Sequence, residues 1–221
     1  MAGPVDYLQV HSYDYVRPVP TVNPNVDPGI VDVAPVIKWH FISHDMNPVN
    51  ASSGPALIPT TTYDKAPRLD YLLVPGPDPF MVLSDETVGF VRRVWSDKRW
   101  AVKGLMTVCS GSMVLAQTGV LDGYRVASNK VALGVAKRNG VLYDKVKWVG
   151  DRRWVVDGRV WSAAGVTAGI DLAAEFLRRE LGEGRRARGL RVLARNLTEY
   201  ESNPDRPDPF AGILEGVELN G

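Results

Sequence analysis

The chain has 221 residues, of which 45% are hydrophobic and 23% charged. This is the composition of a globular protein and excludes a disordered, collagenous or disulfide-stapled chain. Lysine and arginine (26) balance aspartate and glutamate (25) to a net charge of +1, so no overall field favours nucleic acid or an acidic membrane as partner. The single cysteine and the three histidines, all before residue 45, argue against an internal disulfide and a zinc site. The first 30 residues lack the pattern of a signal peptide, and no apolar run is long enough to span a membrane. We therefore expect a cytoplasmic protein.

The first half of the chain is shaped by proline. Nine of the 16 prolines lie in the first 60 residues, which excludes long helices there. We expect a short helix over 4–15, an irregular connection over 17–34, and a strand over 36–43, where β-branched and aromatic residues are mixed. A second strand over 69–74 must end at the proline-rich run 75–79.

The middle of the chain alternates helix and strand. A serine at position 84 followed by apolar residues at helical spacing predicts an amphipathic helix over 85–97. A short apolar strand over 105–108 is followed by small residues, and a helical pattern covers 113–118. These features predict a strand, a tight turn and a helix.

The last third continues this alternation. A hairpin is predicted over 154–161, turning at Asp157-Gly158. Helices are predicted over 168–181 and 192–201, separated by a basic, glycine-containing stretch that reads as a solvated surface. Alternating strands and helices in a chain of this length predict one α/β domain over residues 1–221, with a parallel sheet covered on both faces.

One position stands out as a candidate for chemistry. Cys109 is predicted to lie where a strand ends and a helix begins, followed by Ser110, Gly111 and Ser112. The free N–H groups at such a helix start favour a thiolate and can also stabilise negative charge that develops on a substrate. The pattern is therefore typical of a nucleophile elbow. A lone cysteine beside a strand is equally well explained as a small buried hydrophobe, and the sequence leaves both interpretations open.

The stretch from Thr107 to Ser128, beginning Thr-Val-Cys-Ser-Gly-Ser, closely resembles the nucleophile segment of the DJ-1/PfpI family, within the class I glutamine amidotransferase-like superfamily. Three further blocks resemble the family in order and spacing: 72–77, 156–171 and 205–210. Two features resemble the isonitrile hydratase-like branch of the family. One is the Asn129-Lys130 pair, which directly follows Ser128, and the other is the block 205–210.

This resemblance implies a flavodoxin-like three-layer sandwich that forms a homodimer, acts on a small molecule and needs no metal or organic cofactor. It implies that Cys109 is the nucleophile, with the backbone N–H groups of Ser110 and Gly76 as oxyanion donors. The Ser110 hydroxyl would orient water or substrate, or else cap the turn. Val166 would line the site, or else belong to the core. Pro77 stands where many relatives carry a second glycine, and proline has no N–H to donate.

The chain also departs from the family pattern. An acidic residue normally precedes the Gly-Pro dipeptide by three positions, but here that dipeptide is Gly3-Pro4, so neither the acid nor the first strand is present. Asp6 follows the dipeptide and is not a replacement. No histidine follows residue 44, which argues against the glutamine hydrolysis of the wider superfamily.

Three hypotheses follow. The first is a cysteine-dependent hydratase or hydrolase of small electrophiles, most simply an isonitrile hydratase. The second is a catalytically silent binding or stress-related member, in which the thiol at most senses oxidation. The third is that the sequence is an incomplete form of an active enzyme. Since the missing strand would be interior, we expect the chain as written to be marginally stable or prone to aggregate.

Overall fold

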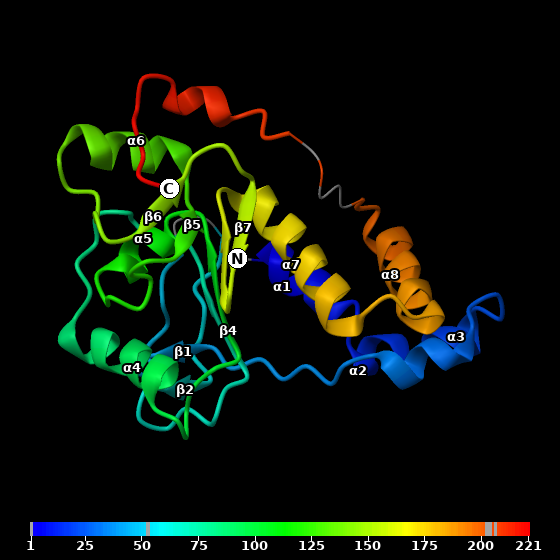
Figure 1. Ribbon diagram of the computed structural model, residues 1–221. Coiled ribbons are helices and arrows are strands. Elements are labelled where there is room, and N and C mark those ends of the chain that lie inside the picture. The colour runs from blue at the N-terminus through cyan, green and yellow to red at the C-terminus, as the bar shows by residue number, and fades with distance from the viewer. Residues whose placement is uncertain (1, 52–53, 202–204, 206) are drawn as a thin grey trace.

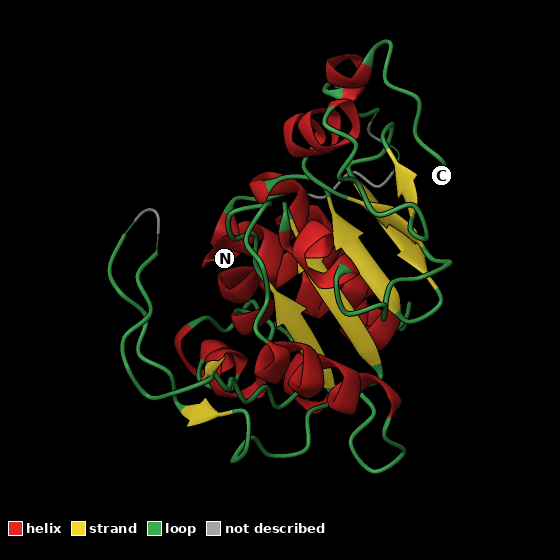
Figure 2. Ribbon diagram, turned by 90° about the vertical axis from the view of Figure 1, so that its left-hand side faces the viewer, coloured by secondary structure: helices red, strands yellow, loops and turns green. Residues whose placement is uncertain are grey.

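Four strands form the central sheet of the computed structural model, which describes residues 2–51, 54–201, 205 and 207–221. Their order across the sheet is β3 (Tyr71–Val74), β4 (Gly104–Val108), β8 (Val160–Ala163) and β7 (Trp154–Asp157). The first three are parallel and β7 is antiparallel to β8 (Figure 2). The predicted, mostly parallel sheet is confirmed, and its most buried strand, β4, runs through the middle.

Helices cover both faces of this sheet (Figure 1). On one face α1 (Ala2–Gln9) packs against α7 (Val166–Leu181). On the other lie α4 (Asp85–Ser96), α5 (Gly111–Ala116) and α6 (Lys130–Arg138). The largest apolar cluster joins this second layer to the sheet through Phe90, Val91, Val94, Leu105, Met113, Leu115, Val126 and Leu133. The layering is that of the expected flavodoxin-like sandwich, and burial of these side chains supplies most of its stability.

A smaller parallel pair lies beside the main sheet. Strand β5 (Arg125–Ala127) pairs with β6 (Lys147–Val149), and Ala127 donates its N–H to the Ser162 hydroxyl of β8 at 2.9 Å. Neither of these strands nor helix α6 is predicted from the sequence. Three-residue strands are too short to show a periodicity. Helix α6 does carry a signal in the sequence, because Asn129 caps it by accepting the Ala132 N–H.

The strand predicted over 36–43 is wrong for most of its length. Only β1 (Ile42–Ser43) is paired, with β2 (Thr61–Thr62). Residues 36–41 have no regular secondary structure, and Ile37 and Trp39 pack against the cluster between α1 and α7 while their neighbours are exposed. The segment has the alternation of a strand but no neighbour in register, and β-propensity cannot reveal that a partner is lacking.

The N-terminal region is also more helical than expected. The predicted helix over 4–15 is broken after α1, because Ser12 accepts the Tyr15 N–H and starts a new helix, α2 (Tyr13–Val16). The connection over 17–34 contains α3 (Val19–Val22) and a 3-10 helix, η1 (Pro28–Val33). Each of these pieces is only four to six residues long, which is what frequent proline allows.

The later elements follow the predictions more closely. Helix α4 starts at the Ser84 cap, the hairpin β7–β8 forms, and its turn residue Gly158 has φ at +56°. Helix α8 (Arg185–Thr198) begins earlier than predicted and continues through Gly189, where a Cβ would lie 3.2 Å from Ile30 of η1. A second 3-10 helix, η2 (Ala211–Leu214), packs on α6. None of the described helices combines the length and apolarity needed to cross a membrane.

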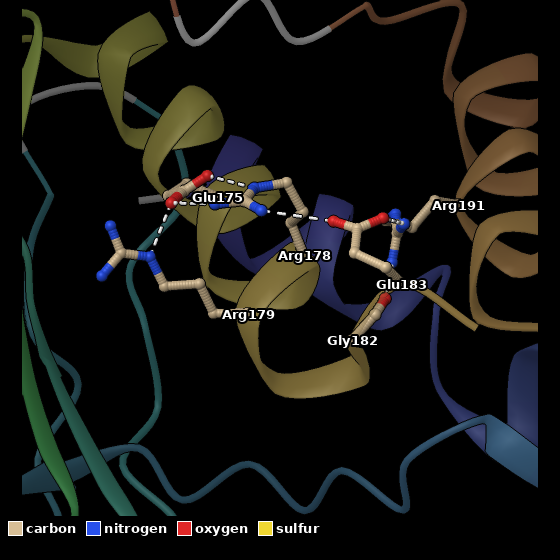
Figure 3. Close-up of polar contacts among 6 residues, drawn as sticks. All are labelled: Glu175, Arg178, Arg179, Gly182, Glu183 and Arg191. Carbon is tan, nitrogen blue, oxygen red and sulfur yellow. Dashed lines mark hydrogen bonds and ion pairs between the residues drawn. The ribbon is translucent and has the colours of Figure 1, made fainter.

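The end of α7 is tied to α8 by charged groups (Figure 3). The buried Glu175 carboxylate accepts two hydrogen bonds from Arg178, at 2.8 and 2.9 Å, and one from Arg179 at 2.6 Å. Arg178 also reaches Glu183, which pairs with Arg191 on α8 at 2.8 Å. Burial by itself would raise the pKa of Glu175, but the two arginines outweigh it and hold the pKa below its ordinary value. Arg191 is thus a structural partner with a side chain only 18% exposed, which differs from the solvated surface predicted for this stretch.

Strand β3 forms one edge of the central sheet. Its four residues are all half-buried, whereas every residue of β4 is buried. Within the described part of the chain no strand pairs with the side of β3 that faces away from β4. An apolar edge with free backbone groups is a template for pairing with another chain.

We therefore expect the protein to aggregate on heating at a temperature that falls as concentration rises. The measurement is circular dichroism with light scattering at a low and a high protein concentration. A reversible, cooperative melt of soluble protein at high temperature, independent of concentration, would contradict this expectation.

His11 is the one histidine that is fully buried. Its Nδ1 lies 2.8 Å from the Tyr7 carbonyl oxygen, and its Nε2 has no hydrogen-bond partner among the described residues. Burial, reinforced by the charge of Arg191, lowers the pKa of His11 to about 4, against the upward pull of the Tyr7 carbonyl. The folded protein therefore holds this ring neutral.

The unfolded chain binds a proton at this ring near pH 6.5, so the free energy of unfolding should fall as pH decreases from about 6.5 to about 4. The contribution of His11 over that range is about 3 kcal/mol. His11→Asn, which can keep the donor to Tyr7, should lose this part of the pH dependence. Urea unfolding of both proteins at pH 7 and pH 4.5 measures the difference, and parallel pH profiles would show that His11 does not contribute.

Candidate active site

The candidate site lies at the carboxyl edge of the central sheet, where three neighbouring strands end. β3 leads into Gly76, β4 into Cys109 and β8 into Ala164. Because parallel strands present their carboxyl ends at the same edge, loops after them meet there. The sequence placed Gly76 and Cys109 at strand ends, and the structure brings them together.

Cys109 occupies a strained turn between β4 and α5. Its φ is +59°, a value uncommon for a residue with a side chain. Its N–H donates to the Ala163 carbonyl at 2.9 Å, and its own carbonyl accepts the Ser128 hydroxyl at 2.9 Å. The residue is partly exposed. Cys109 is therefore not fully buried, and the tight turn predicted between the strand and the helix is confirmed.

Two glycines allow the loop after β3 to meet this turn. A Cβ at Gly76 would lie 2.7 Å from the Cys109 Cβ and 3.0 Å from the Ser110 nitrogen. A Cβ at Gly111 would lie 2.6 Å from the Pro75 carbonyl oxygen and 2.7 Å from that of Val74. Only glycine fits at either position without moving the backbone.

The amides beside Cys109 are available. Within the described part of the chain neither the Ser110 nor the Gly76 N–H donates to another residue. The Ser110 hydroxyl donates to the Pro77 carbonyl at 2.5 Å, which fixes the two loops to each other. Pro77 offers no N–H, but its carbonyl supports the turn. Ser110 is 4% exposed, so its hydroxyl is committed to this contact and not directed at solvent.

Val166 does not lie in the hydrophobic core, which was the alternative to its lining the site. It is the first residue of α7 and is 63% exposed, so core packing does not explain it. The helix starts at Gly165 with no side-chain cap, which leaves its first amides free.

Among the described residues no carboxylate is hydrogen-bonded to Cys109. Asp6 is exposed on α1, so it has the position expected for a residue that takes no part in the site. His40 and His44 are both exposed, and His44 contacts the neighbouring Ser43 and Asp45 side chains. Among the described residues no group of three or more histidine, cysteine, aspartate or glutamate side chains could hold a metal ion.

Sequence reasoning missed two buried ion pairs near this edge. Lys130, after Ser128 and Asn129, lies 2.5 Å from a carboxylate oxygen of Asp208 in the C-terminal segment, with side chains 4% and 1% exposed. Arg153 pairs with Asp171 of α7 at 2.6 Å, and the Tyr200 hydroxyl donates to the same carboxylate. The blocks containing Lys130 and Asp208 carried the resemblance, but nothing in the sequence shows that they touch. Residue 206, which belongs to the block 205–210, lies outside the described residues.

Comparison with known proteins places this geometry in context. The chain is 32% identical over 151 residues to an isonitrile hydratase from Pseudomonas putida, covering 67% of this chain and 61% of that protein. It is 28% identical over 145 residues to the HTH-type transcriptional regulator CdhR from Pseudomonas aeruginosa, covering 65% of this chain and 41% of the regulator. The chain thus spans about three-fifths of the first relative and two-fifths of the second.

Solved structures agree on the fold. A THiJ/PfpI family protein from Pseudomonas syringae superposes with a TM-score of 0.57 and 26% identity, over 80% of this chain and 69% of that one. A DJ-1 superfamily protein from Salmonella typhimurium superposes with a TM-score of 0.56 and 18% identity, over 78% of this chain and 88% of that one. The DJ-1/PfpI family matches residues 13–179, which include the Cys109 turn and all four strands of the central sheet. The chain belongs to the DJ-1/PfpI family.

Proposed function

We propose that this protein is a cysteine-dependent hydratase of small electrophiles, and that it converts an isonitrile and water into an N-substituted formamide. The observation that carries the proposal is the strained, partly exposed Cys109 beside two amides with no protein acceptor in the described chain. The 32% identity to an isonitrile hydratase supports the choice of substrate. We further propose that it works as a cytoplasmic homodimer.

The reaction needs one nucleophile and one water. The Cys109 sulfur bonds to the terminal carbon of R–N≡C, and a proton is delivered to that carbon, giving the thioimidate R–N=CH–S. Water then adds to the same carbon, the C–S bond breaks, and the nitrogen takes up a proton to give R–NH–CHO and free thiol. The N–H groups of Ser110 and Gly76 would stabilise negative charge during both additions.

A second candidate is a catalytically silent ligand-binding protein. One observation favours it: no carboxylate of the described chain is hydrogen-bonded to Cys109, so the described residues place no acid on the thiol to move protons. Proton transfer in the hydratase proposal therefore goes through water. The similarity to a transcriptional regulator over part of its length is compatible with a binding role.

Replacing the nucleophile tests the proposal. Cys109→Ala should lower the turnover of benzyl isocyanide by at least about 1000-fold, because no other thiol exists in the chain. Formamide production is followed by chromatography, with circular dichroism to confirm folding. Alkylating the wild-type thiol with one equivalent of iodoacetamide should have the same effect.

Full activity of Cys109→Ala would refute the proposal. Absence of turnover in the wild-type protein on isonitriles, glyoxals and small amides would also refute it, in favour of the silent binding protein.

Ser128 should position Cys109 without touching the substrate. Its hydroxyl is the closest side-chain donor to the Cys109 carbonyl, at 2.9 Å, whereas Ser112 lies at 3.5 Å and donates better to Ala127 at 3.1 Å. Fixing this carbonyl fixes the peptide plane that carries the Ser110 N–H. The Ser128 hydroxyl, by holding the Cys109 carbonyl, therefore orients the Ser110 N–H at the other side of the same peptide bond.

Ser128→Ala should lower kcat/KM about 10- to 100-fold, since a buried carbonyl loses its donor. The rate at which iodoacetamide alkylates Cys109 should fall as well, Ser128→Thr should restore both, and Ser112→Ala should have a smaller effect. A Ser128→Ala protein with wild-type alkylation and turnover rates would rule out this role.

A further inference from the structure

The loop between β3 and α4, residues 75–84, carries Gly76, whose backbone approaches the Cys109 turn. The loop contains no helix or strand. Three consecutive apolar side chains in it are exposed to solvent: Phe80 by 49%, Met81 by 45% and Val82 by 85%. Because these side chains do not anchor the loop in the core, its far part depends on polar contacts for its position.

One side chain outside the loop makes two such contacts. The Gln117 amide nitrogen donates to the Met81 carbonyl at 2.8 Å, and the Gln117 amide oxygen accepts the Leu83 N–H at 3.1 Å. A glutamine amide donates and accepts at the same time, so a single side chain binds two backbone groups of opposite kind. Within the described part of the chain, no other side chain from outside the loop is hydrogen-bonded to residues 78–83.

Gln117 belongs to the same helix that begins at the Cys109 turn. Ser110 is the first flanking residue of α5, Gln117 is the last, and residues 111–116 between them are all buried. Ser110 and Gln117 are seven residues apart, which is about two helical turns, so they lie on the same face of α5. Ser110 binds the Pro77 carbonyl near the start of the loop, and Gln117 binds its far end. The loop is therefore tied at two points to one helix that is fixed in the core.

This arrangement matters for chemistry because stabilisation of negative charge depends on short distances. A donor is effective when it lies about 2.7–3.1 Å from the developing charge. The Cys109 sulfur is positioned by β4 and α5, whereas the Gly76 N–H is carried by the loop and donates to no described residue. A shift of the loop by about 0.5 Å would weaken the Gly76 donor and leave the sulfur where it is.

We propose that Gln117 is a positioning residue, which holds the loop after β3 against α5 and so keeps the Gly76 N–H in place beside Cys109. The inference rests on the proposed function for the role of the Gly76 N–H as a donor to the reacting atoms. It does not rest on it for the position of the loop, because both hydrogen bonds of Gln117 are made without a substrate.

Gln117→Met tests the proposal, since methionine has a similar length but cannot donate to the Met81 carbonyl and accepts only weakly. We expect kcat for benzyl isocyanide to fall about tenfold while KM changes less than about twofold, because the Gly76 N–H acts in the transition state. The rate at which iodoacetamide alkylates Cys109 should stay within about twofold, because that reaction develops no charge that an amide must stabilise. Ser128→Ala, by contrast, should lower both rates.

The position of the loop can be measured without turnover. Amide hydrogen exchange in peptides covering residues 78–84, followed by mass spectrometry, should be at least about fivefold faster in Gln117→Met than in the wild-type protein. Gln117→Glu should have an intermediate effect on exchange and on kcat. Its carboxylate still accepts the Leu83 N–H but cannot donate to the Met81 carbonyl.

Arg92→Met is the matched control. Arg92 on α4 donates to the Thr118 carbonyl at 2.9 Å, so this variant removes a hydrogen bond at the same end of α5 without touching the loop. It should leave exchange in residues 78–84, alkylation and turnover within about twofold of wild type. Melting curves of all variants show whether each is folded.

The inference is overturned if loop exchange in Gln117→Met matches that of the wild type, or if kcat is unchanged in an active protein. It is also overturned if kcat and the alkylation rate fall together, as they would from a loss of folded protein. Failure of the proposed function is distinguishable. If the wild-type protein does not turn over isonitriles, the hydratase is refuted, while faster loop exchange with unchanged alkylation in Gln117→Met still supports the positioning role.

Discussion

The backbone of Cys109 is held with φ at +59°, a conformation that costs a residue with a side chain about 1–3 kcal/mol. It persists because its surroundings leave no alternative. The Cys109 N–H is bound to Ala163 and its carbonyl to Ser128. On the other side, the backbone at Gly76 approaches so closely that a Cβ there would lie 2.7 Å from that of Cys109. Contacts spread over three strand ends offset the strain, and they also expose the thiol and the neighbouring amides.

The central sheet, the helices on its faces and the C-terminal segment hold or surround this turn. The buried strand β4 delivers Cys109 to the edge of the sheet, and helices on both faces hold that strand in place. The C-terminal segment returns to the same edge of the sheet, where Asp208 forms an ion pair with Lys130. Residues of this segment also line a cavity there. A buried ion pair contributes little net stability but fixes which segment lies where, since either partner alone would be left uncompensated. The Lys130–Asp208 pair therefore determines the shape of the cavity more than the stability of the fold.

The sequence was informative where chemistry is local. A short apolar strand followed by small residues was enough to predict the turn at Cys109, and the Ser84 cap was enough to start α4. It was misleading where structure depends on a partner. The segment 36–43 has strand-like residues, yet only its last two are paired. The cavity could not be predicted at all, because it depends on contacts such as Lys130 with Asp208, which propensity and periodicity do not encode. The sequence identified Val166 as a candidate site residue, but it did not show that the side chain is exposed.

The most direct measurement of the central claim is to trap the covalent intermediate on the sulfur. Wild-type protein is mixed with benzyl isocyanide, quenched with cyanoborohydride to reduce the C=N bond, digested, and analysed by mass spectrometry. The account predicts a peptide containing Cys109 that is heavier by the mass of the isonitrile plus two hydrogens. Sustained formation of the formamide with an unmodified Cys109 peptide at every quench time would contradict it.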